Sequence, residues 1–359
     1  MSDRAYIETP GSDLSYTGQL RRAWADDMME LTIMPTENCN FRCTYCYEDF
    51  SIGRMSEETI SRLKALLSSR IPELSHLHIS WFGGEPLAAA DVVFEISEHI
   101  QPLIQEHDVA YTAHMTTNGS LLTLERFNRL VKLGVNHFQI SLDGPKEFHD
   151  QTRLTLGKTG SYDRIIQNLE EIRTSEIPGH VMIRLHITDA NQASLDPFVR
   201  YLARYFLNDA RFSLFFVPIG KLGGPNDEHI QVVDPHEINS LIAKLVAAVK
   251  EEQALVLGLA PSDFSKADLP ANTVPINTNA APQDNETIDV CYASRPNALV
   301  IRADGRIGKC TVALSSERNT IGSLLPDGLL QIDNEKHHTW INGWFNGDKN
   351  HLKCPAGIF

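Results

Sequence analysis

The chain has 359 residues, of which 42% are hydrophobic and 22% charged, and its formal net charge is −14 at pH 7. These proportions are typical of a globular protein with one large α/β domain and a smaller module. The negative charge disfavours nucleic-acid substrates, because an acidic surface repels phosphate backbones. We find no apolar run long enough to span a membrane and no secretion signal, so we expect a cytoplasmic protein.

After an irregular N-terminal segment (1–29), short apolar runs typical of strands alternate with amphipathic patterns typical of helices. The strands are expected at 30–35, 77–82, 109–116, 137–142, 181–188 and 212–218. The helices are expected at 56–69, 90–105, 124–133, 162–174 and 195–206. This alternation predicts β/α units around a parallel sheet. Six strands are too few for an eight-stranded barrel, so we expect an α/β fold with a partial (β/α)6 TIM-like barrel over 30–232.

The remainder is expected to form a connection and a small second module. An apolar stripe predicts a helix over 235–252. The stretch 258–289 is rich in Pro, Asn, Ala and Asp, which is typical of a linker, a mobile loop or a lid. We therefore expect a connecting region at 233–289 and a C-terminal module at 290–359, in which Asp304 and Gly305 predict a hairpin turn.

Three of the six cysteines lie close together directly after the first predicted strand, at Cys39, Cys43 and Cys46. In a reducing compartment, such crowding indicates metal binding or catalysis rather than disulfides. A Cys-x3-Cys-x2-Cys loop can hold three irons of a 4Fe–4S cluster and leave the fourth iron open to a substrate. Zinc is the alternative, although it would need a fourth Cys or His close by.

This loop, with the aromatic Tyr47 after its last cysteine, resembles the cluster loop of the radical S-adenosylmethionine (SAM) superfamily. The resemblance implies that the open iron binds the amino and carboxylate groups of SAM. It further implies that reductive cleavage of SAM gives a 5′-deoxyadenosyl radical, which abstracts hydrogen from a C–H bond. An electron donor such as flavodoxin or ferredoxin is then expected as a partner.

Three polar or glycine-rich segments, 83–86, 117–119 and 141–145, also follow the next three predicted strands. Active-site loops of barrel-like β/α folds lie at such strand ends. Each could be a plain turn. The resemblance implies that the first contacts the amino group of SAM, through close backbone approach and the Glu85 carboxylate. The expected SAM site consists of Gly83, Gly84, Glu85, Pro86, Asn118, Ser141, Asp143 and Arg153. Arg153 and Arg184 are candidates for carboxylate pairing, with structural roles as the alternative.

The other three cysteines, Cys291, Cys310 and Cys354, are spread over the C-terminal module. The Gly305-x4-Cys310 spacing and the stretch 141–168 resemble the SPASM or twitch subgroup of peptide-modifying radical SAM enzymes. The resemblance implies one or two auxiliary 4Fe–4S clusters that use these cysteines. A full SPASM module has more cysteines, so we expect either a reduced module or a further tail, with buried structural cysteines as the alternative.

The subgroup acts mostly on peptides, so we expect a maturase that crosslinks or otherwise modifies a ribosomally made precursor peptide. An anaerobic sulfatase-maturating enzyme is the alternative, but Thr311 stands where such enzymes typically carry an Asp base. An enzyme acting on a small molecule and a non-catalytic electron-transfer protein also remain open. No catalytic acid or base is identifiable. The segments 220–225 and 258–289 are expected to face the substrate, or to be plain surface loops.

Overall fold

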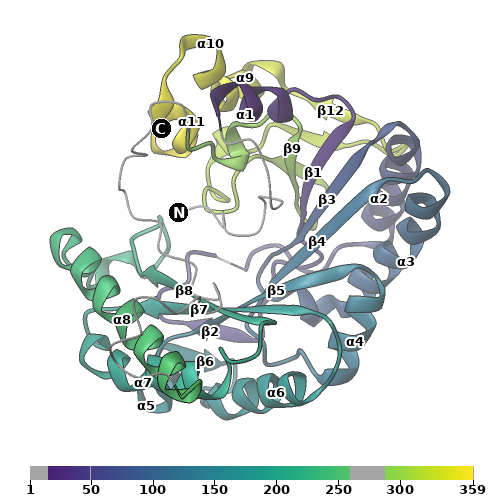
Figure 1. The fold of residues 1–359 in the computed structure, drawn as a ribbon. Coiled ribbons are helices and arrows are strands. Elements are labelled where there is room, and N and C mark those ends of the chain that lie inside the picture. Colours follow the sequence, from purple (N-terminus) through teal and green to yellow (C-terminus); the bar gives the residue numbers. More distant parts are fainter. Residues whose placement is uncertain (1–14, 49, 259–287, 359) are drawn as a thin grey trace.

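The computed structural model describes residues 15–48, 50–258 and 288–358. Its central feature is a parallel sheet wrapped on its outer side by helices (Figure 1). Six strands follow the predicted order: β1 (Met28–Ile33), β3 (His76–Trp81), β4 (Ala110–Thr117), β5 (Val135–Leu142), β7 (His180–Ile187) and β8 (Phe212–Pro218). Each is parallel to the next. The predicted α/β partial barrel is therefore confirmed.

Helices connect these strands and cover the outer face of the sheet (Figure 1). They are α2 (Glu57–Arg70), α3 (Ala90–Glu106), α4 (Leu124–Lys132), α5 (Lys146–Thr152), α6 (Tyr162–Thr174), α7 (Leu195–Tyr205) and α8 (Pro235–Val256). Side-chain caps fix where several begin: Ser56 accepts from the Thr59 amide at the start of α2, and Thr123 accepts from the Arg126 amide at the start of α4. The polar residues between the apolar runs therefore act as start signals.

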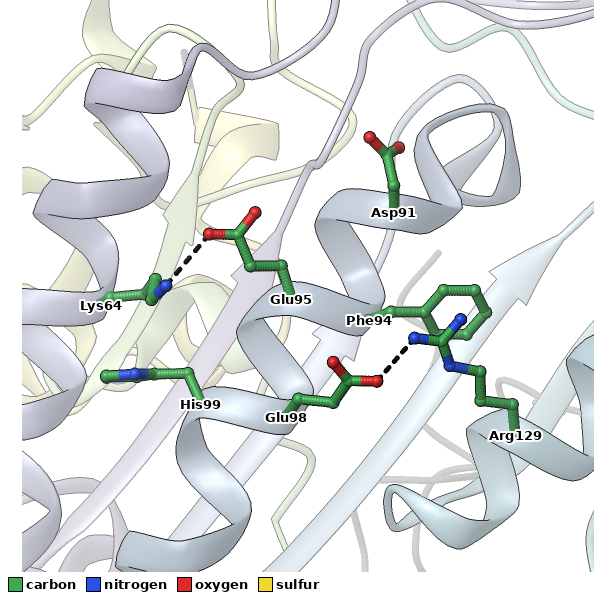
Figure 2. Close-up of a pocket in the computed structure, with 7 residues that line it drawn as sticks. All are labelled: Lys64, Asp91, Phe94, Glu95, Glu98, His99 and Arg129. Carbon is green, nitrogen blue, oxygen red and sulfur yellow. Dashed lines mark hydrogen bonds and ion pairs between the residues drawn. The ribbon is translucent and has the colours of Figure 1, made fainter.

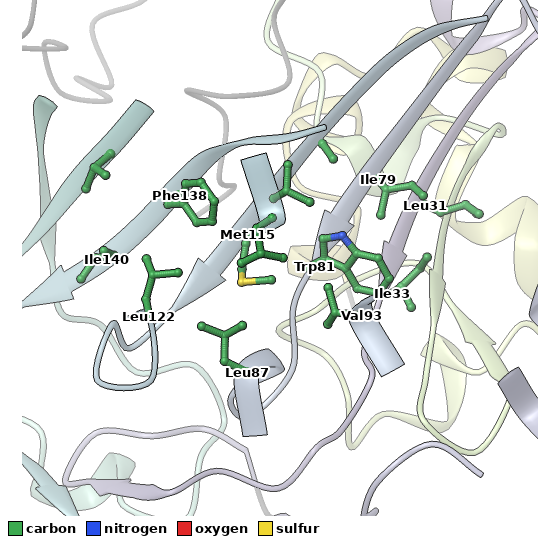
Figure 3. Close-up of a cluster of buried hydrophobic side chains, with 14 of the residues drawn as sticks. Leu31, Ile33, Ile79, Trp81, Leu87, Val93, Met115, Leu122, Phe138 and Ile140 are labelled. Carbon is green, nitrogen blue, oxygen red and sulfur yellow. The ribbon is translucent and has the colours of Figure 1, made fainter. Parts of the chain in front are cut away.

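Alternation along the strands separates an apolar outer face from a more polar inner face. The outer side chains pack against the helices and form the main core, which includes Leu31, Ile33, Ile79, Trp81, Leu87, Val93, Met115, Leu122, Phe138 and Ile140 (Figure 3). The intervening residues, such as His78, Ser80 and His186, are also buried. The inner face therefore supplies polar groups to the interior of the partial barrel.

The C-terminal strands continue the same sheet. β9 (Ala298–Ile301) lies parallel to β1, and β10 (Arg306–Gly308) pairs with β9 in the predicted antiparallel hairpin around Asp304 and Gly305. β11 (Gly322–Leu324) and β12 (Leu330–Ile332) extend it, giving the order β12-β11-β10-β9-β1-β3-β4-β5-β7-β8. The short helices α9 (Asn334–Ile341), α10 (Gly343–Asn346) and α11 (Lys349–Lys353) follow. The division of the chain into domains remains a prediction.

Two buried ion pairs join these C-terminal strands to the barrel. Arg295 donates to both carboxylate oxygens of Glu30 at 3.1 Å. Arg302 forms a bidentate pair with Glu37, at 3.0 and 2.5 Å, two residues before Cys39. The start of the cysteine loop is therefore held in part by a residue from the end of the chain.

The N-terminal segment differs from the prediction. Residues Tyr16–Ala23 form helix α1, because Ser15 caps its first turn by accepting from the Gly18 amide. The expectation of an irregular segment over 1–29 is therefore wrong for this part. Most of the predicted loop 258–289 lies outside the described residues. Among the helices that are described, none has the length and apolar character needed to cross a membrane.

Candidate active site

The cysteine loop follows β1 and contains a short strand that the sequence analysis did not predict. This strand, β2 (Phe41–Cys43), pairs with β6 (Arg153–Thr155) in a separate antiparallel sheet, in which Cys43 lies opposite Arg153. The Phe41 amide donates to the Cys39 sulfur at 3.3 Å, and the Cys46 amide donates to the Cys43 carbonyl at 3.1 Å. All three cysteines have free, partly buried thiols. The loop is therefore an ordered structure with its sulfur atoms near one another and near a guanidinium.

The two glycines after β3 allow the backbone to pack against the start of this loop. A Cβ on Gly83 would lie 2.2 Å from the Thr36 carbonyl oxygen, and one on Gly84 would lie 2.5 Å from the Asn38 carbonyl oxygen. The Glu85 amide donates to that same Asn38 oxygen at 3.0 Å. Only glycine permits such an approach. These glycines thus fix the position of the backbone that leads into Cys39.

The Glu85 carboxylate joins the ends of β3 and β4. It is fully buried and accepts from the amides of Leu87 (2.9 Å) and Asn118 (2.7 Å) and from the Thr117 hydroxyl (2.8 Å). Burial raises its pKa, and these three hydrogen bonds oppose the rise. Glu85 therefore has a structural function in this arrangement, and its predicted contact with the SAM amino group remains a prediction.

Asn118 lies directly beside the cysteine loop. Its side-chain amide donates to the Asn40 side-chain oxygen at 2.8 Å and reaches the Cys39 sulfur at 3.9 Å. Ser120 completes this group, because its hydroxyl donates to the Asn118 side-chain oxygen at 2.7 Å and accepts from Asn40 at 3.0 Å. The loop after β4 is thereby attached to the segment around Cys39.

Asp143, at the end of β5, is the centre of a second buried network. Its Oδ1 accepts from the Tyr45 hydroxyl at 2.9 Å and lies 3.0 Å from His186 Nδ1, and its Oδ2 accepts from the Thr152 hydroxyl at 2.6 Å. Arg153 donates to the Tyr45 hydroxyl at 2.7 Å. Burial would raise the pKa of Asp143. The hydrogen bond to His186 and the charge of Arg153 nevertheless hold this pKa well below its usual range. Asp143 is therefore ionised and already bonded within the protein.

Residues 33–202 match the family profile described as the Radical SAM superfamily. The chain contains a radical SAM domain. The superfamily uses a 4Fe–4S cluster and SAM. This domain includes Cys39, Cys43, Cys46 and the strand-end residues up to His186.

Curated relatives of the chain carry out several reactions. A cysteine-type anaerobic sulfatase-maturating enzyme of Clostridium novyi is 24% identical over 60% of this chain and 58% of its own length. PqqA peptide cyclase of Bradyrhizobium diazoefficiens is 34% identical over 31% of this chain and 28% of its own length. An AdoMet-dependent heme synthase of Methanosarcina barkeri is 28% identical over 54% of this chain and 52% of its own length. The chain thus spans 58% or less of each of these relatives.

Solved structures share the fold of the radical SAM domain and its C-terminal extension. The structure of native anSMEcpe with bound AdoMet and Cp18Cys peptide has a TM-score of 0.61 at 17% identity, over 87% of this chain and 80% of that one. The structure of Streptococcus suis SuiB bound to S-adenosylmethionine has a TM-score of 0.57 at 15% identity, over 95% of this chain and 70% of that one. A further SuiB structure holds the precursor peptide SuiA. At these identities the similarity shows the fold alone.

Burial makes the three thiols of the cysteine loop weaker acids than free cysteine. Burial, together with nearby acidic groups and the other thiols, raises the pKa values of Cys39 and Cys46 to about 12, and burial also raises the pKa of Cys43. Without a metal, these sulfurs would therefore stay protonated, whereas bound iron stabilises the thiolates. In the described ranges, no three His, Cys, Asp or Glu side chains are arranged to hold a metal ion. In a cubane cluster, by contrast, each thiolate binds its own iron.

Arg153 offers a suitable group for the carboxylate of SAM. Its guanidinium lies 3.9 Å from Asp143 Oδ1, and its Nε is buried without a hydrogen-bond partner among the described residues. A buried donor of this kind is costly unless a ligand binds it. Since Arg153 lies opposite Cys43, its unused donor fits a carboxylate bound beside the cysteine loop. Ser141, two residues before Asp143, is buried in register with Arg184 on β7.

Two of the three cysteines of the C-terminal region, Cys291 and Cys310, lie near Tyr292. Burial raises the pKa of Tyr292 well above its usual value, and the neighbouring thiols of Cys310 and Cys291 raise it further. Burial likewise raises the pKa of Cys310, with a contribution from Cys354, which is exposed at the end of α11. The structure therefore brings the cysteines of this region near one another. The auxiliary cluster itself remains a prediction.

The predicted base position, Thr311, contacts the same tyrosine. The Thr311 amide donates to the Tyr292 hydroxyl at 2.8 Å, and the two hydroxyl groups lie 2.9 Å apart. Of the segment 220–225, Gly224 lies against the backbone of Cys46 and Tyr47, where an added Cβ would meet Tyr47 Cα at 2.6 Å. This part of the predicted substrate-facing loop therefore also supports the cysteine loop.

Four members of the site were not predicted from the sequence: Tyr45, Thr152, His186 and Asn40. Tyr45 lies between two of the expected ligands, so its position was a usable signal. His186 lies on the inner face near the carboxyl end of β7, and strand alternation could have identified it. Thr152 and Asn40 give no such signal, because their partners lie on other strand-end loops: Asp143 for Thr152, and Asn118 and Ser120 for Asn40.

Proposed function

We propose that the chain is a radical SAM peptide maturase, which cleaves SAM reductively and modifies a side chain of a ribosomally made precursor peptide. The observation that carries the proposal is the cysteine loop, in which three partly buried thiols lie beside a buried arginine with an unused donor. A 4Fe–4S cluster bound there, with SAM on its open iron, supplies the radical that abstracts hydrogen.

The residues of this chain hold and orient the reactants. Cys39, Cys43 and Cys46 would hold the cluster, and Arg153 would pair with the SAM carboxylate through its buried donor. Tyr45 and Asp143 keep that guanidinium in place. The Tyr45 hydroxyl accepts from Arg153 and donates to the Asp143 carboxylate. The buried inner face of the barrel would exclude water from the reactive carbon centre.

The peptide class of substrate is supported by the relatives and neighbours that act on or bind peptides, including PqqA peptide cyclase and SuiB with the precursor peptide SuiA. An auxiliary 4Fe–4S cluster held in part by Cys291, Cys310 and Cys354 is a component of this proposal. Gly83, Gly84, Pro86, Asn118 and Ser141 are proposed to complete the SAM site, at the carboxyl ends of β3, β4 and β5.

Anaerobic reconstitution with iron and sulfide tests this function. The wild-type protein should bind about four irons at the first site and should form 5′-deoxyadenosine from SAM with dithionite. A variant with Cys39, Cys43 and Cys46 replaced by Ala should lose both properties, whereas Cys354→Ala should retain SAM cleavage. Formation of 5′-deoxyadenosine by the triple variant would contradict the assignment.

Sulfatase maturation is the second candidate. It is supported by the Clostridium novyi relative and by the anSMEcpe structure with its Cp18Cys peptide. It is disfavoured by Thr311, whose hydroxyl contacts Tyr292 where a base is expected. Incubation with a cysteine-containing sulfatase peptide and, separately, with a precursor peptide encoded beside the gene would distinguish the two by mass spectrometry. Conversion of the sulfatase peptide to formylglycine would favour the second candidate.

A further inference from the structure

A hollow of about 540 Å³ lies on the outer surface of the barrel, between the loop after β4 and helices α3, α4 and α6. It is lined by Phe94, Ser120, Leu121, Thr123, Glu125, Arg126, Arg129 and Arg164. Three arginines thus face one carboxylate. In a chain whose net charge is −14, such a concentration of positive charge is a local exception.

Two of these arginines share the hollow with Glu125 but have no ion-pair partner among the described residues. The Arg126 guanidinium donates to the Leu121 carbonyl at 3.0 Å, and neither Arg126 nor Arg164 forms an ion pair with a described residue. Arg129 differs, since it pairs with Glu98 at 2.6 Å and lies over the Phe94 ring at 3.9 Å. Figure 2 shows Arg129 between Phe94 and Glu98, at the border with a neighbouring, mixed-charge hollow. The available positive charge therefore belongs to Arg126 and Arg164.

The wall of this hollow is connected to the cysteine loop by short contacts. Ser120 lines the hollow and donates to the Asn118 side-chain oxygen at 2.7 Å. The Asn118 amide reaches the Cys39 sulfur at 3.9 Å. Two side-chain contacts therefore separate a basic surface from the first of the cluster cysteines.

We propose that this hollow, around Arg126 and Arg164, docks the acidic one-electron carrier protein that reduces the cluster. The proposal rests on the proposed function, because reductive SAM cleavage needs an electron. On docking, the reduced carrier loses one electron and the cluster gains one, with no bond made or broken. Because the net charge of the chain is −14, the molecule as a whole repels an acidic carrier, and a local concentration of positive charge favours its docking.

A double variant, Arg126→Glu with Arg164→Glu, tests the proposal with reduced flavodoxin as the probe. Flavodoxin binding to the reconstituted enzyme, measured by titration calorimetry at about 0.1 M ionic strength, should weaken by about tenfold or more, since like charges across an interface are costly. Flavodoxin-driven formation of 5′-deoxyadenosine should fall in proportion, at subsaturating carrier. Dithionite-driven formation should stay within about twofold of wild type, because dithionite needs no docking surface.

Two further variants keep the test decisive. Arg164→Glu alone should weaken flavodoxin binding in the same direction without disturbing the Arg126–Leu121 contact. Arg21→Glu, on the exposed face of α1, is the matched control and should leave binding unchanged. Unchanged flavodoxin binding in the double variant would overturn the proposal, as would equal weakening by Arg21→Glu or equal losses with both reductants. A wild-type protein that binds flavodoxin but forms no 5′-deoxyadenosine with dithionite would contradict the proposed function instead.

Discussion

Arg153 shows how one residue links the electrostatics of the site to its shape. Its guanidinium donates to Tyr45, lies near Asp143 and retains a buried Nε without a protein partner. Burial opposes its charged form, but neighbours that include the ionised Asp143 hold its pKa well above the usual value. The residue therefore has a fixed charge and a fixed direction, as recognition of a carboxylate requires.

Replacement of Arg153 by Lys should weaken SAM binding by about tenfold or more, because a single ammonium nitrogen cannot occupy both the Nη1 position that holds Tyr45 and the Nε position that is left for a carboxylate. Equilibrium binding of SAM to the reconstituted protein measures this effect, with iron content as the check that the cluster is present. Arg200→Lys on the exposed face of α7 is the control and should bind SAM normally. Unchanged SAM affinity in Arg153→Lys would exclude Arg153 from the SAM site.

Glu30 determines part of the response to acid. Burial alone would raise its pKa, but Arg295 and Arg22 lower it from 4.5 to about 2. A carboxylate of this kind stabilises the fold at pH values above the ordinary pKa of the carboxyl group. That contribution is lost as the pH falls from about 5 to about 2. Glu30→Gln should therefore be less stable than wild type at pH 7, and the difference should shrink over this interval. Urea unfolding at several pH values measures it, and a constant difference would contradict the assignment.

At the scale of elements, the glycine turn after β3 is the tightest contact of the site. A Cβ on Gly84 would lie 2.5 Å from the Asn38 oxygen and 2.6 Å from the Glu37 oxygen, and backbone atoms cannot swing away as a flexible side chain can. Gly84→Ala should lower the free energy of unfolding by about 1–3 kcal/mol and should reduce iron incorporation. Gly220→Ala, where nothing lies within 4 Å, is the matched control. Equal stability of the two variants would show that the turn adapts.

The sequence predicted the elements whose signals are local. The six parallel strands and five of the helices between them were expected close to their observed bounds, since apolar runs and caps lie within each segment, whereas α5 was not expected. The strands β2 and β6 were missed because three-residue strands carry no periodicity, and their pairing joins residues more than a hundred positions apart. The site followed the same rule. The cysteines and the glycine turn were visible, whereas the Tyr45–Asp143–His186 contacts exist only once β2, β5 and β7 have met.

At the scale of the whole molecule, the Glu37–Arg302 pair couples the end of the chain to the cysteine loop. Both side chains are almost completely buried. Removing one partner leaves an uncompensated charge, so Arg302→Met or Glu37→Leu alone should lower the free energy of unfolding by about 3–5 kcal/mol.

The double variant, Arg302→Met with Glu37→Leu, should recover much of that loss, because no charge is left without its partner. Urea unfolding of all four proteins gives the coupling free energy. The exposed pair Arg54–Glu57 serves as the comparison and should show a coupling near zero. Strictly additive losses at Glu37 and Arg302 would mean that the cysteine loop and the C-terminal strands are not energetically linked.

The position of β9 also has a consequence for biosynthesis. β1 gains its second neighbour only when residues 298–301 have left the ribosome, so one edge of the nascent sheet stays open while the barrel strands β3 to β8 are made. For the same period Glu30 has Arg22 but lacks Arg295, and Glu37 lacks Arg302. Cluster assembly on the neighbouring cysteines should accordingly follow the synthesis of β9 rather than accompany that of the barrel strands.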